Sequence, residues 1–226
     1  NFDWWRKRFK RQFELVDLLR LDHFRGLAGY WRVNGNSNTA ISGRWITSPG
    51  RSLLNKLKID LGTNFLPIIA EDLGVITPDV EKLRKNFGLP GMKILQFAFD
   101  GNEDNPYLPK NIEGENWVVY TGTHDNSTSI SWWESLENNA KKRIKEEYKF
   151  SENPSWSLIK IGMNTNTNLF IAPIQDILSL DDSSRLNIPG TIKNNWKWKL
   201  NLTLGEIEDN LRKFSDLGNS FGRIRR

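Results

Sequence analysis

The sequence predicts an α/β fold in which helices cover a parallel β-sheet. Short apolar runs of strand length alternate with segments of helical periodicity, and three of these runs end in an acidic residue. The chain has 226 residues, of which 38% are hydrophobic and 26% charged, a composition typical of a globular protein with a sizeable core. A barrel and an open doubly wound sheet both agree with this pattern.

Helices and strands alternate through the first half of the chain. Apolar residues at spacings of three and four predict a first helix that buries one face, made of Phe2, Trp5, Phe9, Phe13 and Val16. The elements expected next are a strand within 16–24, a loop rich in Gly, Asn and Ser at 34–44, a helix near 51–60 and a strand within 65–74. A further helix is expected to have Thr77 as N-cap and Pro78 at its first position and to end at Gly88.

The second half continues the alternation. The elements expected there are strands within 92–99, 116–126 and 168–178, a helix rich in Lys and Glu at 127–149, and a C-terminal amphipathic helix that buries Ile207, Leu211, Phe214 and Leu217. This gives five strands in all. Neither an internal repeat nor a low-complexity segment interrupts the pattern.

Composition and charge exclude several classes of protein. The absence of cysteine excludes disulfides and thiolate metal sites. No apolar run approaches the ~20 residues that span a bilayer, so we expect a soluble protein without a membrane partner. The net charge of +5 is concentrated in "RKRFKRQ" (6–12) and "RIRR" (223–226). Because no nucleic-acid-binding motif accompanies these runs, we interpret them as a solvated helix face and a terminal tail.

Ten tryptophans are an unusual number for this length. Aromatic faces suit flat, partly apolar ligands such as sugar rings. However, Trp4, Trp5, Trp132 and Trp133 lie in segments of helical pattern, where packing in the core is the favoured interpretation.

Acidic residues follow the apolar runs "LLRLDHF", "PIIAEDLG" and "VVYTGTHDN", which is where the chemistry of parallel α/β folds is found. Side chains alternate along a strand, so Arg20 and Asp22 project to one side while Leu19 and Leu21 pack behind them. A neighbouring guanidinium favours the ionised carboxylate that a nucleophile needs, and a drier setting after "LPIIA" would suit Glu71 as a general acid.

Enzymes that cleave glycosidic bonds commonly use two carboxyl groups, one in an environment that favours its ionised form and one in an environment that favours its protonated form. Asp125 is a third acid, and the two histidines, His23 and His124, each adjoin an acid. Taken alone, each acid is more often a helix N-cap or an ion-pair partner after a strand than a catalyst. A zinc or iron site is a less favoured alternative, because no pair of histidines has the spacing expected on one helix or strand.

Several motifs in this order closely resemble the amylomaltase, or disproportionating-enzyme, family of 4-α-glucanotransferases, which belongs to the α-amylase clan. The motifs are "RLDHFRG", "IIAEDLGVITPDV", "PGMKILQFAF", "YTGTHDN", "APIQDIL", "RLNIPG" and "NNWKWKL". The resemblance extends from Trp4 to about Leu200. It implies a (β/α)₈ TIM barrel, of which this chain would hold the later strands, about five.

The resemblance also implies roles for individual residues. Asp22 matches the nucleophile, Arg20 the arginine that orients it, and Glu71 the general acid/base. Asp125 matches the acid that grips sugar hydroxyls and helps to distort the ring.

The substrate-binding set implied in this way is Arg20, His23, His124 and Asn126. The substrates would be malto-oligosaccharides and glucose, with no cofactor, metal or nucleic acid. A retaining mechanism predicts that the carboxyl groups of Asp22 and Glu71 lie ~5–5.5 Å apart.

The chain is short for a barrel of ~250 residues, so we expect residues 1–226 to be the C-terminal portion of a single catalytic barrel domain, inactive by itself. The location expected is the cytoplasm, or the plastid in a plant or alga. Two alternatives remain open: a hydrolytic enzyme of the α-amylase type, and a non-catalytic glucan-binding remnant. The presence of Asp22, Glu71 and Asp125 favours an enzyme.

Overall fold

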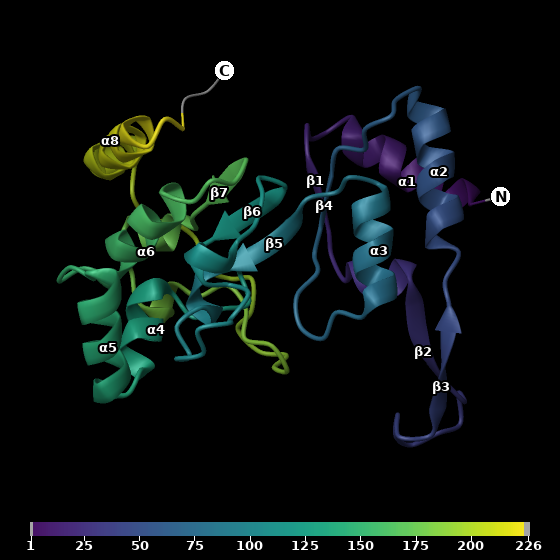
Figure 1. The fold of residues 1–226 in the computed structure, drawn as a ribbon, viewed down its shortest axis with the longest axis horizontal. Helices are drawn as coiled ribbons and strands as arrows, with labels where there is room; N and C mark the ends of the chain where they lie inside the picture. The colour runs from purple at the N-terminus through teal and green to yellow at the C-terminus, as the bar shows by residue number, and fades with distance from the viewer. Residues whose placement is uncertain (1, 224–226) are drawn as a thin grey trace. The chain divides into compact units, whose positions relative to one another are not determined.

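The computed structural model describes residues 2–223, so residues 224–226 of the basic C-terminal run lie outside the described part. The chain forms two compact units, one up to Met92 and one from Lys93 onward, which are described separately. That residues 1–226 belong to a single domain stays a prediction. Helices and short strands alternate in both units, so the α/β class is confirmed (Figure 1).

The first unit holds two small sheets and three α-helices (Figure 1). Its elements are α1 (Asp3–Phe13), β1 (Leu19–Leu21), β2 (Gly29–Val33), β3 (Gly43–Thr47), α2 (Gly50–Leu61), β4 (Ile68–Ala70) and α3 (Pro78–Asn86). Strands β1 and β4 pair in parallel, with Leu19 opposite Ile68 and Leu21 opposite Ala70. The predicted strands at 16–24 and 65–74 are therefore present and adjacent.

Apolar side chains from the helices, from β4 and from the segments next to them form the core of this unit. The most deeply buried include Phe24, Leu54, Leu57, Ile68 and Leu89. Helix α3 begins at Pro78, and Gly88, with φ of +63°, follows it in a left-handed conformation that glycine adopts without strain. Thr77 is the N-cap as predicted.

Helix α1 buries Phe9 but leaves both of its tryptophans at the surface. Trp4 is 63% and Trp5 38% exposed, so the prediction that they pack in the core is wrong. Trp4 lies about 140° and 180° around the helix from Phe9 and Phe13, because each residue turns the helix by about 100°. Val16 follows the end of the helix and is also exposed.

An antiparallel hairpin, β2–β3, flanks the predicted loop and was missed from the sequence. Trp31 pairs with Trp45 across the hairpin, and their ring centroids are 5.7 Å apart. Almost every residue of both strands is exposed, and Arg32 lies opposite Arg44. A strand that buries neither face has no apolar alternation from which it can be predicted.

The second unit holds a three-stranded sheet in the order β5-β6-β7, with β6 and β7 parallel (Figure 1). Its elements are β5 (Gly91–Ile94), which crosses the boundary between the units, β6 (Trp117–Tyr120), α4 (Ser129–Ser135), α5 (Asn138–Tyr148), α6 (Pro154–Met163), β7 (Leu169–Ile171), α7 (Ile174–Ile177) and α8 (Leu204–Ser220). Trp132 and Trp133 pack against its core, as predicted.

Several predicted boundaries in this unit were wrong. The helix expected at 127–149 is two helices, because Leu136 and Glu137 take extended conformations between α4 and α5. The strand expected at 168–178 ends at Ile171, and Pro173 precedes the short helix α7. Residues Leu95–Phe97 form a 3₁₀ turn rather than continuing β5.

Two helices in this unit contrast in how they could be predicted. Helix α6 was missed, because most of its residues are buried and it lacks an apolar stripe. Helix α8 is present, with a capping box between Thr203 and Glu206, but the prediction that it buries Leu211 is wrong, because that side chain is exposed. Within residues 2–223, no helix is both long and apolar enough to cross a membrane.

Candidate active site

The register of β1 and β4 places two acidic residues side by side along the backbone of the first unit. Leu21 lies opposite Ala70, so Asp22 and Glu71 leave the ends of neighbouring parallel strands side by side. The backbone continues this pairing: the Glu71 N–H donates to the Leu21 carbonyl at 3.0 Å, and the Phe24 N–H donates to the Glu71 carbonyl at 3.1 Å. Adjacent strands are about 4.8 Å apart, which sets the scale of the separation between these two residues.

Arg20 and Asp22 lie on the same side of β1, as the alternation of side chains predicts. Arg20 Nη2 and Asp22 Oδ1 form an ion pair of 2.9 Å, and Arg20 Nε donates to the Met92 sulfur at 3.3 Å. The Asp22 side chain is 75% exposed, and no hydrogen bond joins its Oδ2 to any of residues 2–223. The arginine therefore fixes one carboxylate oxygen and leaves the other accessible.

Backbone N–H groups hold both oxygens of the Glu71 carboxylate. The His23 N–H donates to Oε2 at 2.7 Å, and the Leu73 N–H donates to Oε1 at 3.0 Å. His23 is in the left-handed conformation, with φ of +49°, at the turn that follows Asp22. The residue after Asp22 in sequence thus donates a hydrogen bond to the Glu71 side chain, so the backbone turn at His23 links the two predicted catalytic acids.

A buried ion pair anchors the loop that carries Glu71. Asp72 Oδ2 lies 3.1 Å from Arg84 Nε, and their side chains are 7% and 5% exposed. Asp72 Oδ1 also accepts from the Met92 N–H at 2.8 Å, while Arg84 Nη1 donates to the Leu89 carbonyl at 3.0 Å. The residue next to Glu71 is thus tied to α3 and to the start of β5.

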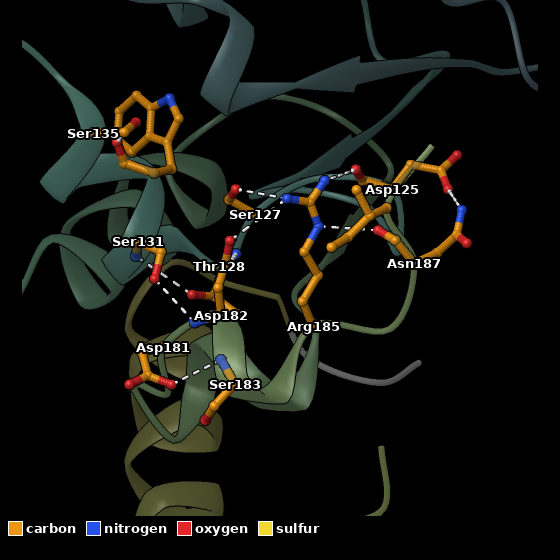
Figure 2. Close-up of polar contacts among 12 residues, drawn as sticks. Asp125, Ser127, Thr128, Ser131, Ser135, Asp181, Asp182, Ser183, Arg185 and Asn187 are labelled. Carbon is orange, nitrogen blue, oxygen red and sulfur yellow. Dashed lines mark hydrogen bonds and ion pairs between the residues drawn. The ribbon is translucent and has the colours of Figure 1, made fainter. Parts of the chain in front are cut away.

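In the second unit, the loop after β6 presents His124 and Asp125. Asp125 Oδ1 accepts from Asn187 Nδ2 at 2.6 Å and lies 3.4 Å from His124 Nε2. The Asp125 side chain is 45% exposed, and its Oδ2 makes no hydrogen bond within the described part of the chain. Figure 2 shows Asn187 and Arg185 meeting Asp125 from the segment after α7.

Arg185 organises this loop with three of its nitrogens. Nη2 donates to the Asp125 carbonyl at 2.6 Å, Nε donates to the Asn187 carbonyl at 2.9 Å, and Nη1 donates to Ser127 Oγ at 3.0 Å (Figure 2). Asp182 adds a second connection, because its Oδ1 accepts from the N–H of Thr128, the N-cap of α4. The segment 182–187 therefore fixes the conformation of 125–128.

Sequence reasoning assigned no role to Arg185 or Asn187, although both belong to the motif "RLNIPG". Their polar side chains before a Pro-Gly turn were the available signal. Asn126, predicted to bind substrate, uses its Oδ1 to accept from the N–H of Thr123 at 2.9 Å and from its hydroxyl at 2.8 Å. The amide oxygen of Asn126 therefore shapes the loop that carries Asp125.

A buried acid holds both ends of this loop. Asp176, on α7, is 1% exposed and accepts from Thr121 Oγ1 at the end of β6 and from Ser129 at the start of α4. The Ser129 N–H and hydroxyl both donate at 2.8 Å. Burial raises the pKa of Asp176, and these hydrogen bonds oppose that shift.

The structure therefore brings Arg20, Asp22, His23 and Glu71 together in the first unit. It brings His124, Asp125 and Asn126 together in the second, beside Arg185 and Asn187, which the sequence analysis left without a role.

Comparison with known proteins supplies an independent finding. A family model described as 4-alpha-glucanotransferase matches residues 1–203. A 4-alpha-glucanotransferase of Synechocystis is 46% identical and is matched over 88% of this chain and 40% of its own length. A chloroplastic/amyloplastic 4-alpha-glucanotransferase of Arabidopsis thaliana is 42% identical, over 99% of this chain and 39% of its own. The chain thus spans about 40% of the length of the curated relatives it matches.

The chain is also similar to two solved structures of amylomaltases. The amylomaltase of Streptococcus agalactiae, in complex with acarbose, superposes with a TM-score of 0.88 at 33% identity, covering 98% of this chain and 44% of that one. The amylomaltase of Corynebacterium glutamicum gives a TM-score of 0.72 at 16% identity, covering 95% of this chain and 37% of the other, a likeness of fold alone.

Proposed function

Because the chain belongs to the 4-alpha-glucanotransferase family, we propose that it carries the catalytic carboxylates of an enzyme that transfers segments of 1,4-α-glucan to the 4-hydroxyl of an acceptor. The observation that carries this proposal is the adjacency of Asp22 and Glu71 at register-paired strand ends, one beside a guanidinium and the other on backbone N–H groups. Retaining cleavage of a glycosidic bond needs two carboxyl groups at neighbouring positions, one as nucleophile and one as acid/base.

In the first step, Asp22 Oδ2 attacks the anomeric carbon of the donor and the bond from that carbon to the leaving oxygen breaks. Glu71 gives its proton to that oxygen, and a β-glucosyl ester forms on Asp22. The ion pair with Arg20 keeps Asp22 oriented while its other oxygen faces the sugar.

In the second step, the 4-hydroxyl of an acceptor glucose or glucan attacks the ester. Glu71 removes the hydroxyl proton, the bond to Asp22 breaks, and the α-configuration is restored. The separation of ~5–5.5 Å between the carboxyl groups of Asp22 and Glu71 stays a prediction. For Asp125 and His124, we propose the binding of sugar hydroxyls, supported by the free Oδ2 of Asp125.

For the fold, we propose that β1, β4, β5, β6 and β7 belong to a (β/α)₈ barrel that segments outside this chain complete. The parallel pairing of β1 with β4 and of β6 with β7 supports this, as does the presence of an acid after β1, β4 and β6. Which part of its relatives the chain matches, and a location in the cytoplasm or a plastid, stay predictions.

Product analysis with maltotriose tests the function. The natural full-length protein should convert maltotriose into glucose together with longer maltodextrins, without net gain of reducing ends. Formation of only shorter products, with a reducing end gained for each bond cleaved, would contradict transfer and support hydrolysis by the same carboxylates.

A further inference from the structure

Trp196 has a backbone conformation that bulky residues rarely adopt. Its φ is +59°, in the left-handed region, and Asn194 two residues earlier has φ of +62°. Asparagine tolerates this region, whereas a large side chain is strained there. Strain of this kind persists only where the surrounding structure imposes it, and it is concentrated at functional sites.

Hydrogen bonds within the segment 186–196 impose the strain. The Trp196 N–H donates to the Leu186 carbonyl at 2.6 Å, which closes the segment into a loop. Asn195 braces the loop from inside, since its Oδ1 accepts from the Ile188 N–H at 3.1 Å and its Nδ2 donates to the Thr191 carbonyl at 3.0 Å. The loop starts next to Asn187, which binds Asp125.

Burial does not compensate for this strain. Trp196 is 62% exposed, whereas Trp156 in the same unit is only 8% exposed. The described contact of the indole is with His124, at 5.0 Å between ring centroids and with the planes inclined by 41°. Trp196 therefore keeps most of its surface open next to His124, whose Nε2 lies 3.4 Å from Asp125 Oδ1.

We propose that Trp196 is a sugar-stacking platform, on which a glucose ring rests while His124 and Asp125 bind its hydroxyls. A pyranose ring has an apolar C–H face and a rim of hydroxyls, so it matches an aromatic face beside a carboxylate and an imidazole. The inference deepens the proposed function and rests on it, because it takes the ligand to be a glucan.

The test compares two substitutions that accept the left-handed conformation, Trp196→Gly and Trp196→Asn, with Trp196→Phe, which keeps an aromatic ring. Binding of acarbose to the natural full-length protein is measured by titration calorimetry, and folding by the urea midpoint. Trp4→Phe, at an equally exposed position on α1, is the matched control.

Gly and Asn should weaken acarbose binding by about tenfold, the equivalent of losing one aromatic contact, and leave the urea midpoint unchanged or higher. Phe and the Trp4 control should bind within about threefold of the natural protein. Natural affinity in either folded variant, Gly or Asn, would overturn the inference. Failure of the unsubstituted protein to bind acarbose or to transfer segments of glucan would instead overturn the proposed function.

A second comparison separates direct stacking from an effect through His124. In a His124→Ala protein, Trp196→Gly should still weaken acarbose binding. Equal affinities of His124→Ala and of the protein with both substitutions would show that Trp196 acts only through the imidazole, and would overturn the proposed contact.

Discussion

Replacing Asp176 by Ala and by Asn should separate the contribution of its hydrogen bonds to stability from the contribution of its charge. The side chain accepts one backbone and two hydroxyl hydrogen bonds, all from residues that are themselves fully buried, Thr121 and Ser129. In Asp176→Ala the Ser129 N–H cannot reorient and stays without a partner, at a cost of about 1–3 kcal/mol, and each hydroxyl loses a bond worth about 0.5–1.5 kcal/mol.

The net cost of Asp176→Ala should be about 2–4 kcal/mol, because removing a buried charge offsets part of the loss. Asp176→Asn keeps an acceptor for the Ser129 N–H, and its new donor can pair with a hydroxyl of Thr121 or Ser129 that rotates to accept. We therefore expect Asp176→Asn to stay within about 1 kcal/mol of the natural protein.

The pH dependence has a definite sign. Burial raises the pKa of Asp176 in the folded protein above its unfolded value of about 3.9. Its contribution to stability is then fully present below the unfolded pKa and is lost as the pH rises through the folded pKa. Asn carries no such charge, so the stability of Asp176→Asn relative to the natural protein should increase with pH across that window.

Urea unfolding of the natural full-length protein and both variants, at a series of pH values, measures these quantities. The transfer rate with maltotriose should fall in Asp176→Ala, which frees the loop carrying Asp125, and be retained in Asp176→Asn. Equal destabilisation by Ala and Asn, or a difference between Asn and the natural protein that does not change with pH, would refute the reasoning.

Other substitutions test the remaining contacts. Asp72→Ala should lower the free energy of unfolding, measured in urea, by about 3–5 kcal/mol, because it removes one member of a buried ion pair. Replacing Asp72 by Leu and Arg84 by Met together should restore most of this loss. Natural stability of Asp72→Ala would contradict the prediction. Arg185→Ala should reduce the transfer rate by about 10²-fold, because the backbone at Asp125 loses its hydrogen bond from the guanidinium. Arg185→Lys should restore little of the lost rate, because an ammonium group lacks the guanidinium fork. An unchanged rate in Arg185→Ala would argue against a positioning role. Glu71→Gln should still be glycosylated by a glucosyl fluoride, whose leaving group needs no proton, but should turn over slowly. If the rate of enzyme glycosylation fell equally with the fluoride and with maltotriose, this would count against Glu71 as the acid.

Rules that use only residues close in sequence were sufficient to predict two features of the structure. The alternation of side chains along a strand placed Arg20 beside Asp22, and the Pro78 and Gly88 signals bounded α3. The adjacency of Asp22 and Glu71 needed more than local rules, because it depends on which strands pair and in which register.

Other features depended on tertiary contacts that the sequence does not specify. The hairpin β2–β3 buries neither face, and α6 is buried on nearly all sides, so neither shows the periodicity of its class. The hold of Arg185 on Asp125 joins residues 60 positions apart in sequence, and only the structure reveals it.

Trapping the covalent intermediate tests the central claim, that Asp22 is the nucleophile, most directly. The full-length Glu71→Gln protein is treated with an α-glucosyl fluoride, quenched and digested with trypsin, and the glucosylated peptide is sequenced by mass spectrometry. We predict a single glucosyl ester on Asp22, and its absence when Asp22 is replaced by Asn. An adduct on another residue, or an unchanged adduct in Asp22→Asn, would contradict the assignment.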